Sequence, residues 1–482
     1  MVRSNFKGKN MFLKSSLMLS VFCLVFSPVG SFADNEMPTN PNIISGNLAI
    51  SSSSNSMTVD QISESGIINW DGFSIGSGNS VDFNNGTGTT LNRVTGSTLS
   101  TIYGNLSATG SLYLINQNGI IFGNKGIVDV GGDFVGSTLG VSNTDFLNGG
   151  DTTFQASSSS SVVNLGSISS SGGDVSLIAH TVLNSGSVTA NNGSASLVAG
   201  SHLLMHDASL DSGKFVVQSG SSGSSVIEKG VIEAATVELK ANGGNIYALA
   251  GNTEGMMRAT GVTTEGGKIF LTAGDTGSVT IEKSLKAVKA NGSGGAVDVT
   301  AGTIVVSGNI DVSSTSGTGG SVYIFSEDRS EFTGTIDASG NGSEGAGGFI
   351  EVSSHKVVSI SGAVNTGVGG TFLIDPEAIT ISENNYTEEN VSHVKTSTIT
   401  GALNGGSNVI IWTRKDIAGP TDGIYKLQQG DISVEQDVLA WGGDDTSGSL
   451  VLLAMGDILV TKNIYNTGTA ASGANLTLIA GW

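Results

Sequence analysis

Cysteine and proline are almost absent from this chain of 482 residues, which contains one cysteine and five prolines. The single cysteine, Cys23, lies near the N-terminus, so the chain beyond it can form neither disulfide bonds nor cysteine metal sites. Because proline cannot donate to a β-ladder, its scarcity suits a chain of many strands. Glycine is abundant instead, with 71 residues, and suits the turns between such strands.

Basic residues are also scarce: there are 21 lysines and arginines against 41 aspartates and glutamates, a net charge of −20. Such a chain is repelled by polyanions, so nucleic acid is not an expected partner. The acidity is spread thinly, since charged residues make up 13% of the chain and hydrophobic residues 38%. Disorder driven by charge is therefore not expected.

Residues 1–33 have the pattern of a secretory signal peptide. Four basic residues precede an apolar run at 17–26, and Ser31-Phe32-Ala33 follows as a small-residue cleavage site. The alternative is a membrane anchor, but a run of ten residues, nine of them apolar, is too short to cross about 30 Å of hydrocarbon. We expect entry through the Sec translocon and cleavage between Ala33 and Asp34, which leaves 17 basic and 41 acidic residues, a net charge of −24.

The middle of the chain repeats. Gly-Gly pairs, each followed by an alternating apolar and polar stretch, begin at positions 172, 243, 266, 294, 319, 347 and 369. From position 243 onward the intervals are 22 to 28 residues, which is typical of a solenoid.

One repeat shows the finer pattern. Short alternating segments at 297–299, 303–306 and 309–312 are separated by turn residues. Three short strands of this kind predict one triangular coil, with apolar residues inward and polar residues outward. We therefore predict an all-β fold, a right-handed parallel β-helix built as a single-stranded solenoid. A β-sandwich array would need antiparallel hairpins and longer strands.

The predicted organisation follows from these patterns. After the signal at 1–33, residues 34–60 are polar and lack the glycine rhythm, which suits an N-terminal cap on the β-helix. We place an N-terminal domain at 34–160, β-helix repeats at 161–370 and further repeats at 371–482, with an insertion near 383–425. The last region opens with Ile374-Asp375-Pro376, a turn signal.

Several blocks between residues 69 and 147 carry a family resemblance. They read Asn-Trp-Asp-Gly-Phe at 69–73, Leu-Asn-Arg-Val at 91–94, Leu-Ile-Asn-Gln-Asn-Gly-Ile-Ile-Phe-Gly at 114–123, Val-Gly-Ser-Thr-Leu at 135–139 and Asp-Phe-Leu at 145–147. In order and spacing they resemble the N-terminal secretion domain of filamentous haemagglutinin-type exoproteins. The resemblance implies two-partner secretion through an outer-membrane β-barrel transporter, and a secreted or surface-associated product.

The same resemblance points to Asn116 and Asn118 as residues of transporter recognition or of early folding. The family usually has Asn-Pro-Asn-Gly where this chain has Gln117 in place of proline. Asn118-Gly119 also predicts a type I′ turn, because both residue types tolerate positive φ. Direct contact with the transporter and a purely structural turn stay open as alternatives.

Asn92 and Arg93 complete the candidate recognition residues. Arg93 is the only charged residue between Asp82 and Lys125, so it needs a partner. We expect an internal ion pair with Asp82 or Asp71, the alternative being the transporter. Asn92 is expected to join an asparagine stack along the helix.

Catalytic chemistry is poorly represented, and we predict no enzyme, no cofactor and no metal site. His202 and His206 would share one face of a strand, but about 13 Å apart, which is too far for one ion. The resemblance favours an adhesin-like rod. A cytolysin or contact-dependent toxin of the same family is the alternative, and a β-helical polysaccharide-degrading enzyme is a weaker one. An adhesin of this kind implies a ligand on a host-cell or bacterial surface.

Overall fold

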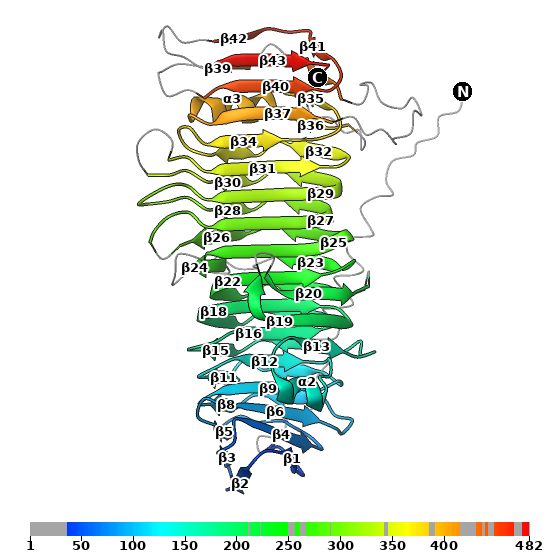
Figure 1. Ribbon diagram of the computed structural model, residues 1–482, viewed down its shortest axis with the longest axis vertical. Coiled ribbons are helices and arrows are strands. Elements are labelled where there is room, and N and C mark those ends of the chain that lie inside the picture. Colours follow the sequence, from blue (N-terminus) through cyan, green and yellow to red (C-terminus); the bar gives the residue numbers. More distant parts are fainter. Residues whose placement is uncertain are drawn as a thin grey trace, which may run out of the picture.

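The chain forms a rod of stacked coils in the computed structural model, ascending from the N-terminal to the C-terminal strands (Figure 1). The structure describes residues 36–210, 213–221, 223–248, 256–260, 267–289, 291–341, 346–384, 391–414, 430–435, 439–441, 448–466 and 475–481. The predicted signal peptide and its cleavage site at Ala33 and Asp34 lie outside the described residues.

Each coil contributes up to three strands, and strands of successive coils pair in parallel along the rod. The first sheet contains β3 (Ser56–Gln61), β5 (Ser80–Asn84), β8 (Asn105–Ala108), β11 (Ile127–Val130), β15 (Ser167–Ser170), the first halves of β18 (Ser187–Ala199) and β22 (Val231–Ala241), β24 (Met256–Thr260), β26 (Ser284–Val288), β28 (Asn309–Asp311), β30 (Thr335–Asp337) and β33 (Ala363–Asn365).

The second sheet follows the first in each coil. It contains β4 (Ser65–Trp70), β6 (Thr89–Val94), β9 (Ser111–Ile115), β12 (Phe134–Ser137), β16 (Val175–Ala179), the second halves of β18 and β22, the first halves of β25 (Lys268–Ile281), β27 (Ala296–Val306) and β29 (Ser321–Phe332), and then β31 (Phe349–Ser354), β34 (Thr371–Ile374), β37 (Asn408–Thr413), β40 (Leu450–Ala454) and β43 (Leu476–Ala480).

The third sheet closes the triangle. It contains β7 (Ser100–Ile102), β10 (Ile120–Phe122), β14 (Ser161–Asn164), β17 (Thr181–Asn184), β21 (Ser225–Glu228), β23 (Asn245–Ala248), the second halves of β25, β27 and β29, and then β32 (Val357–Ile360), β36 (His393–Val394), β35 (Ile379–Ile381), β38 (Ile432–Val434) and β41 (Ile458–Val460). The predicted parallel β-helix is confirmed.

The alternation of side chains explains why these residues form strands of a solenoid. In β27, Val297 and Val299 point inward and are fully buried, while Asp298 between them points outward. Each buried valine contributes about 1.5–3 kcal/mol relative to an exposed one. Such residues form one continuous core from Met57 to Ala454. The coil predicted at 297–312 is found as the two halves of β27 followed by β28.

The N-terminal end of the rod is closed by antiparallel strands. β1 (Asn42–Ser45) pairs antiparallel with β4, and β2 (Leu48–Ser52) pairs antiparallel with β3. β3 itself pairs in parallel with β5 and so already belongs to the first coil. The cap strands therefore cover residues 42–52, within the predicted range of 34–60, and they occupy the edge to which another parallel strand could add.

The range 383–425, where an insertion is predicted, also contains parts of the coils. Strand β37 lies within that range and pairs in register with β34 and β40. Helix α3 (Thr396–Asn404) takes a coil position beside β33 and buries Ile399, Ala402 and Leu403 in the main core. The last coils add a two-stranded pair of β39 (Leu439–Trp441) and β42 (Ile464–Asn466). No helix in the described part of the chain is long and apolar enough to cross a membrane.

A polar ladder runs inside one corner of the rod, where the third sheet ends. The Asn164 amide donates to Asn184 Oδ1 over 2.8 Å, and the Asn184 amide donates to both carboxyl oxygens of Glu228, at 3.1 and 2.9 Å. The Gly230 N–H also donates to Glu228. Glu228 is almost fully buried, and burial raises its pKa to about 8 despite these hydrogen bonds.

Glu228 makes the stability of the rod depend on pH. Its folded pKa lies above the ordinary value of 4.5, so folding favours the protonated carboxyl. Stability is full below about pH 4.5 and falls by at most about 5 kcal/mol as the pH rises to about 8. Because Glu228→Gln cannot ionise, we expect its urea midpoint to change less than that of the wild type between about pH 5 and pH 9. The exposed Glu64→Gln variant is the control; an unaltered pH dependence in Glu228→Gln would contradict the assignment.

Candidate functional site

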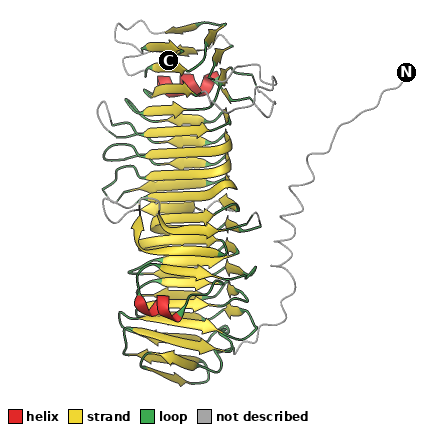
Figure 2. Ribbon diagram, turned by 45° about the vertical axis from the view of Figure 1, so that its right-hand side comes forward, coloured by secondary structure: helices red, strands yellow, loops and turns green. Residues whose placement is uncertain are grey.

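An accessory layer covers the outer face of the N-terminal coils, where Figure 2 shows the red helix α2. It consists of α2 (Asn143–Asn148) and a three-stranded antiparallel sheet of β13 (Thr152–Gln155), β19 (His202–Leu210) and β20 (Gly213–Ser219). The Ser142 hydroxyl caps α2 by accepting from the Asp145 N–H over 3.0 Å. The layer therefore joins segments that come before β14 in the chain with segments that come after β18.

A second apolar core lies under this layer. Outward-facing residues of the second sheet form a ladder, and the accessory layer supplies the residues that cover it. The ladder consists of Ile67, Leu91, Tyr113, Ile115, Val135, Ile178 and Val198, and the cover consists of Leu139, Val141, Phe146, Phe154, Leu203, Met205 and Phe215. Because large apolar side chains in a row on a free surface are unfavourable in water, the ladder accounts for the presence of the layer.

The sequence reasoning missed this second core, although a signal for it exists. Residues 112–115 read Leu-Tyr-Leu-Ile, an unbroken apolar run where one-sided burial would give alternation. Such runs are typical of strands that are buried on both faces.

Buried charges fasten the upper edge of the layer. Glu238 of β22 accepts hydrogen bonds from the N–H groups of Lys214 and Phe215, both at 3.0 Å, and pairs with Lys240 Nζ at 2.7 Å. Lys214 Nζ lies 2.5 Å from Asp174. Burial opposes the charge on Lys214, but Asp174, together with Asp133 and Asp207, outweighs burial and raises the lysine pKa. Removing one member would leave its partner buried and unpaired, which is strongly destabilising.

Arg93 belongs to this layer, and the predicted ion pair with Asp82 or Asp71 is wrong. Its guanidinium donates to Val141 O over 2.9 Å and to Asn69 Oδ1 over 3.3 Å, and burial lowers its pKa. Within the described residues it has no ion pair. The strand register explains this, because Arg93 of β6 stands beside Asn69 of β4, while Asp82 lies in the first sheet.

Asn92 faces the opposite way, into the main core, and is fully buried. Its Oδ1 accepts from Trp70 Nε1 over 3.0 Å, and its amide donates to Tyr113 O over 3.4 Å. The predicted asparagine stack is therefore wrong here, because the register places Ile68 and Leu114 on either side of Asn92. Trp70 is fully buried and packs edge-on against Phe73, at 5.4 Å between ring centroids.

Asn116 sits at the corner after β9, fully buried. Its amide donates to Thr98 O over 3.0 Å and to Ser100 Oγ over 2.9 Å, in the coil before. Its N–H donates to Ser137 O, in the coil after. Its Oδ1 accepts from the Asn118 N–H over 2.9 Å. One side chain and one N–H therefore hold three successive coils in register at this corner.

The turn at 116–119 differs from the predicted type I′ turn. The Gly119 N–H donates to Asn116 O over 3.1 Å, so Gln117 and Asn118 are the two central residues. Asn118 does not have a positive φ, whereas Gly119 has a φ of 120°. Asparagine first and glycine fourth is the pattern of a type I turn. The expectation failed because it placed Gly119 in the centre of the turn rather than at its end.

These residues do not form one exposed surface. Asn92 and Asn116 are buried, Arg93 is half-buried under the accessory layer, and only Gln117 and Asn118 are exposed. The Asn118 amide also donates to Gly96 O over 2.9 Å. Among the described residues no group of His, Cys, Asp or Glu is arranged to hold a metal ion.

A family model described as the TPS secretion domain matches residues 30–287, more than half of the chain. The chain belongs to this family. The predicted resemblance to the secretion domain of two-partner exoproteins is confirmed. TPS proteins are exported across the outer membrane to the cell surface or the extracellular space, with a partner outer-membrane transporter. The match extends past residue 160 and includes all of the accessory layer.

One solved structure agrees with the TPS assignment at the level of fold. The secretion domain of HMW1 from Haemophilus influenzae is 21% identical, with a TM-score of 0.57 over 78% of this chain and 100% of that one. The filamentous hemagglutinin secretion domain is 12% identical over 78% of this chain and 99% of that one, and its TM-score of 0.33 adds nothing to this agreement. A search of curated proteins finds no match.

The type I turn predicts that the proline typical of the family fits at Gln117. Proline is favoured at the second position of this turn, and the Gln117 N–H donates no hydrogen bond within the described structure. We expect Gln117→Pro to stabilise the protein by about 0.4–1 kcal/mol, seen as a higher thermal midpoint. Asn118→Pro is the matched control, and it should destabilise because it removes the Asn118 N–H bond to Asn116. Equal midpoints for the two variants would refute the turn assignment.

Proposed function

We propose that this TPS protein is an adhesin-like rod that is displayed on or released from the cell. The observation that carries the proposal is the continuity of the β-helix beyond the secretion domain: one core runs from Met57 to Ala454, past the end of the family match at 287. Fifteen strands among the described residues stack in the second sheet, which at about 4.8 Å each gives a rod of about 70 Å. Such a rod offers long side faces for recognition.

We propose binding rather than catalysis as the role of these faces. The TPS secretion domain is a non-enzymatic secretion domain, which supports this choice for residues 30–287. The coils beyond it repeat the same architecture, and their outward polar positions are mostly Ser, Thr, Asp and Asn. Residues 1–33 would act as a signal peptide read by the Sec translocon, with cleavage between Ala33 and Asp34.

Within the secretion domain, we assign different roles to the candidate recognition residues. Asn92, Arg93 and Asn116 act inward: they position the core, the accessory layer and the corner of three coils. Gln117 and Asn118 present the exposed side of the turn, where a transporter could touch it. In this proposal the periplasmic part of the transporter contacts these two exposed side chains.

Export should depend on the partner barrel. In cells that carry the signal peptide machinery but lack the transporter, we expect the chain to accumulate in the periplasm, and restoring the transporter should release it to the surface. The measurement is protease accessibility of the full chain on intact cells. Unchanged surface exposure without the transporter would sink the proposal.

The division of roles can be tested by comparing export with stability. Asn116→Ala should lower both, because it removes the amide bonds to Thr98 and Ser100, worth about 1 kcal/mol each. Asn118→Ala should lower export several-fold more than its loss of stability explains. Asn124→Ala, an exposed residue at the next corner, is the control and should leave export unchanged. Export of Asn118→Ala that follows its stability alone would exclude transporter contact at the turn.

A further inference from the structure

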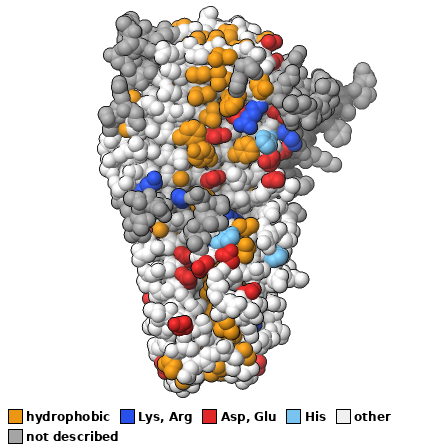
Figure 3. Space-filling view, in the orientation of Figure 1, with side chains coloured by type: hydrophobic (Ala, Val, Ile, Leu, Met, Phe, Trp, Pro, Cys, Tyr) orange, Lys and Arg blue, Asp and Glu red, His pale blue; other side chains and the backbone are white. Residues whose placement is uncertain are grey.

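Above the accessory layer, the outward column of the second sheet alternates between ring and carboxylate. Register pairs Phe270 with Asp298, Asp298 with Tyr323, and Tyr323 with Glu351, one residue from each of four successive coils. Phe270 is buried, while Tyr323 is 43% exposed. Figure 3 shows the result as a band of hydrophobic side chains with single acidic side chains among them.

A pair of aromatic rings forms a platform on this band. The rings of Tyr323 and Phe349 lie 5.2 Å apart between centroids with a tilt of 37°. Phe349 begins β31 and stands one coil above Ser321, so the two rings come from neighbouring coils. Phe349 is half-buried, and its ring reaches the edge of a groove.

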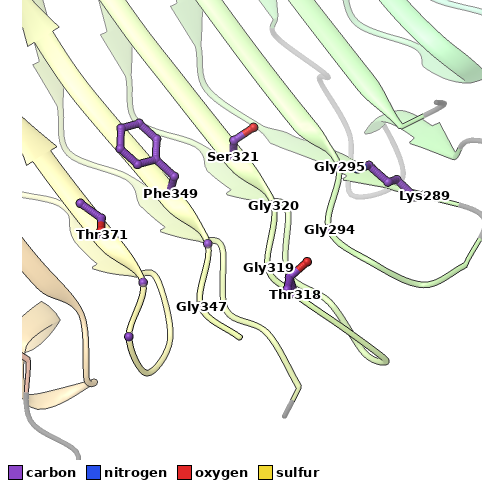
Figure 4. A pocket seen from close by; sticks show the side chains of 13 residues that line it. Lys289, Gly294, Gly295, Thr318, Gly319, Gly320, Ser321, Gly347, Phe349 and Thr371 are labelled. Carbon is purple, nitrogen blue, oxygen red and sulfur yellow. The ribbon is translucent and has the colours of Figure 1, made fainter. Parts of the chain in front are cut away.

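The groove runs across the corner where the Gly-Gly pairs stack. It has a volume of about 370 Å³, and its floor is the glycine backbone of four successive coils (Figure 4). A Cβ at Gly320 would lie 2.3 Å from Gly295 O, and one at Gly348 would lie 2.2 Å from Gly320 O. The coils therefore require glycine here to stack closely. The consequence is a floor of polar backbone without side chains, with Phe349 and Thr371 on one side and Lys289 at its end.

The charges on this surface decide which ligand it suits. A dry protein interface is depleted of charge at its centre, whereas Asp298 and Glu351 interrupt the rings at every second coil. A second copy of the chain would bring like carboxylates together, and a polyanion would be repelled by them. A neutral sugar chain suits both the aromatic rings and the carboxylates. Its ring faces pack on aromatic rings, and its hydroxyl groups donate to carboxylates and backbone carbonyls.

We propose that the Tyr323–Phe349 platform and the adjoining glycine groove bind a neutral oligosaccharide. The inference rests on the proposed adhesive role and names its ligand class. Sugar rings stack on Tyr323 and Phe349, the Glu351 carboxylate accepts from hydroxyl groups, and the chain continues over the glycine floor toward Lys289.

The test uses the full mature chain and defined hexasaccharides in isothermal titration calorimetry. The neutral probes are the β-1,4 oligomers of glucose, N-acetylglucosamine and mannose and the α-1,4 oligomer of glucose, and a heparin hexasaccharide is the anionic probe. We expect at least one neutral probe to bind. Its affinity should fall by about tenfold or more in the double variant Tyr323→Ala with Phe349→Ala. Glu351→Gln should also weaken binding, whereas Tyr465→Ala, which removes an exposed ring elsewhere, should not.

The outcomes separate this inference from the adhesive role. Binding of no neutral probe, binding unchanged in the double variant, or preference for the heparin probe would overturn the site. Adhesion of cells that display the chain is measured in parallel, with each variant's surface level matched to the wild type. Adhesion that persists in the double variant overturns this site and leaves the adhesive role standing. Wild-type cells that do not adhere overturn the adhesive role itself, whatever the calorimetry gives.

Discussion

Backbone hydrogen bonding between successive coils is the constraint on which the rest of the structure depends. Most strands of the three long sheets pair only with strands of the coils before and after them, which satisfy their N–H and C=O groups. Unpaired buried backbone groups are costly, so each coil must keep the register of its neighbours. This explains the straight inward columns of valine and isoleucine, the glycines that allow close approach at the corners, and the antiparallel cap of β1 and β2 at the first coil.

The parts of the fold that follow from this constraint could be predicted from the sequence. In-register stacking repeats one pattern, and residues 297–312 show it clearly enough to place three strands of a coil. Alternation in such segments gives the inward side chains directly. What escapes is every feature that depends on a contact between non-equivalent positions. The outer ladder at Tyr113 is covered by Phe146. Phe146 lies in α2, a helix of six residues, which is too short to show a helical repeat of apolar residues in the sequence.

The candidate site shows the same division. The residue types and the corner position of Asn116 could be read from the sequence, because the motif lies between two predicted strands. The partners of Arg93 could not, since they depend on which side of the coil each neighbour faces and on an accessory segment around Val141. A charge count suggested a carboxylate, but a neutral amide and a carbonyl satisfy the guanidinium. The turn type likewise depended on one hydrogen bond, from Gly119 to Asn116.

The accessory layer implies an order in which the parts of the secretion domain can fold. The outer ladder begins with Ile67 and Leu91, but Phe215 at its cover lies far later in the chain, on β20. In any process that presents the polypeptide from its N-terminus, the first coils can stack as soon as they emerge. Helix α2 and strand β13 then cover part of the apolar ladder, and the rest of it stays exposed until β20 follows. Until then, the partly emerged rod exposes apolar side chains on that face. The second core is complete when β20 packs over the ladder and the N–H groups of Lys214 and Phe215 donate to Glu238.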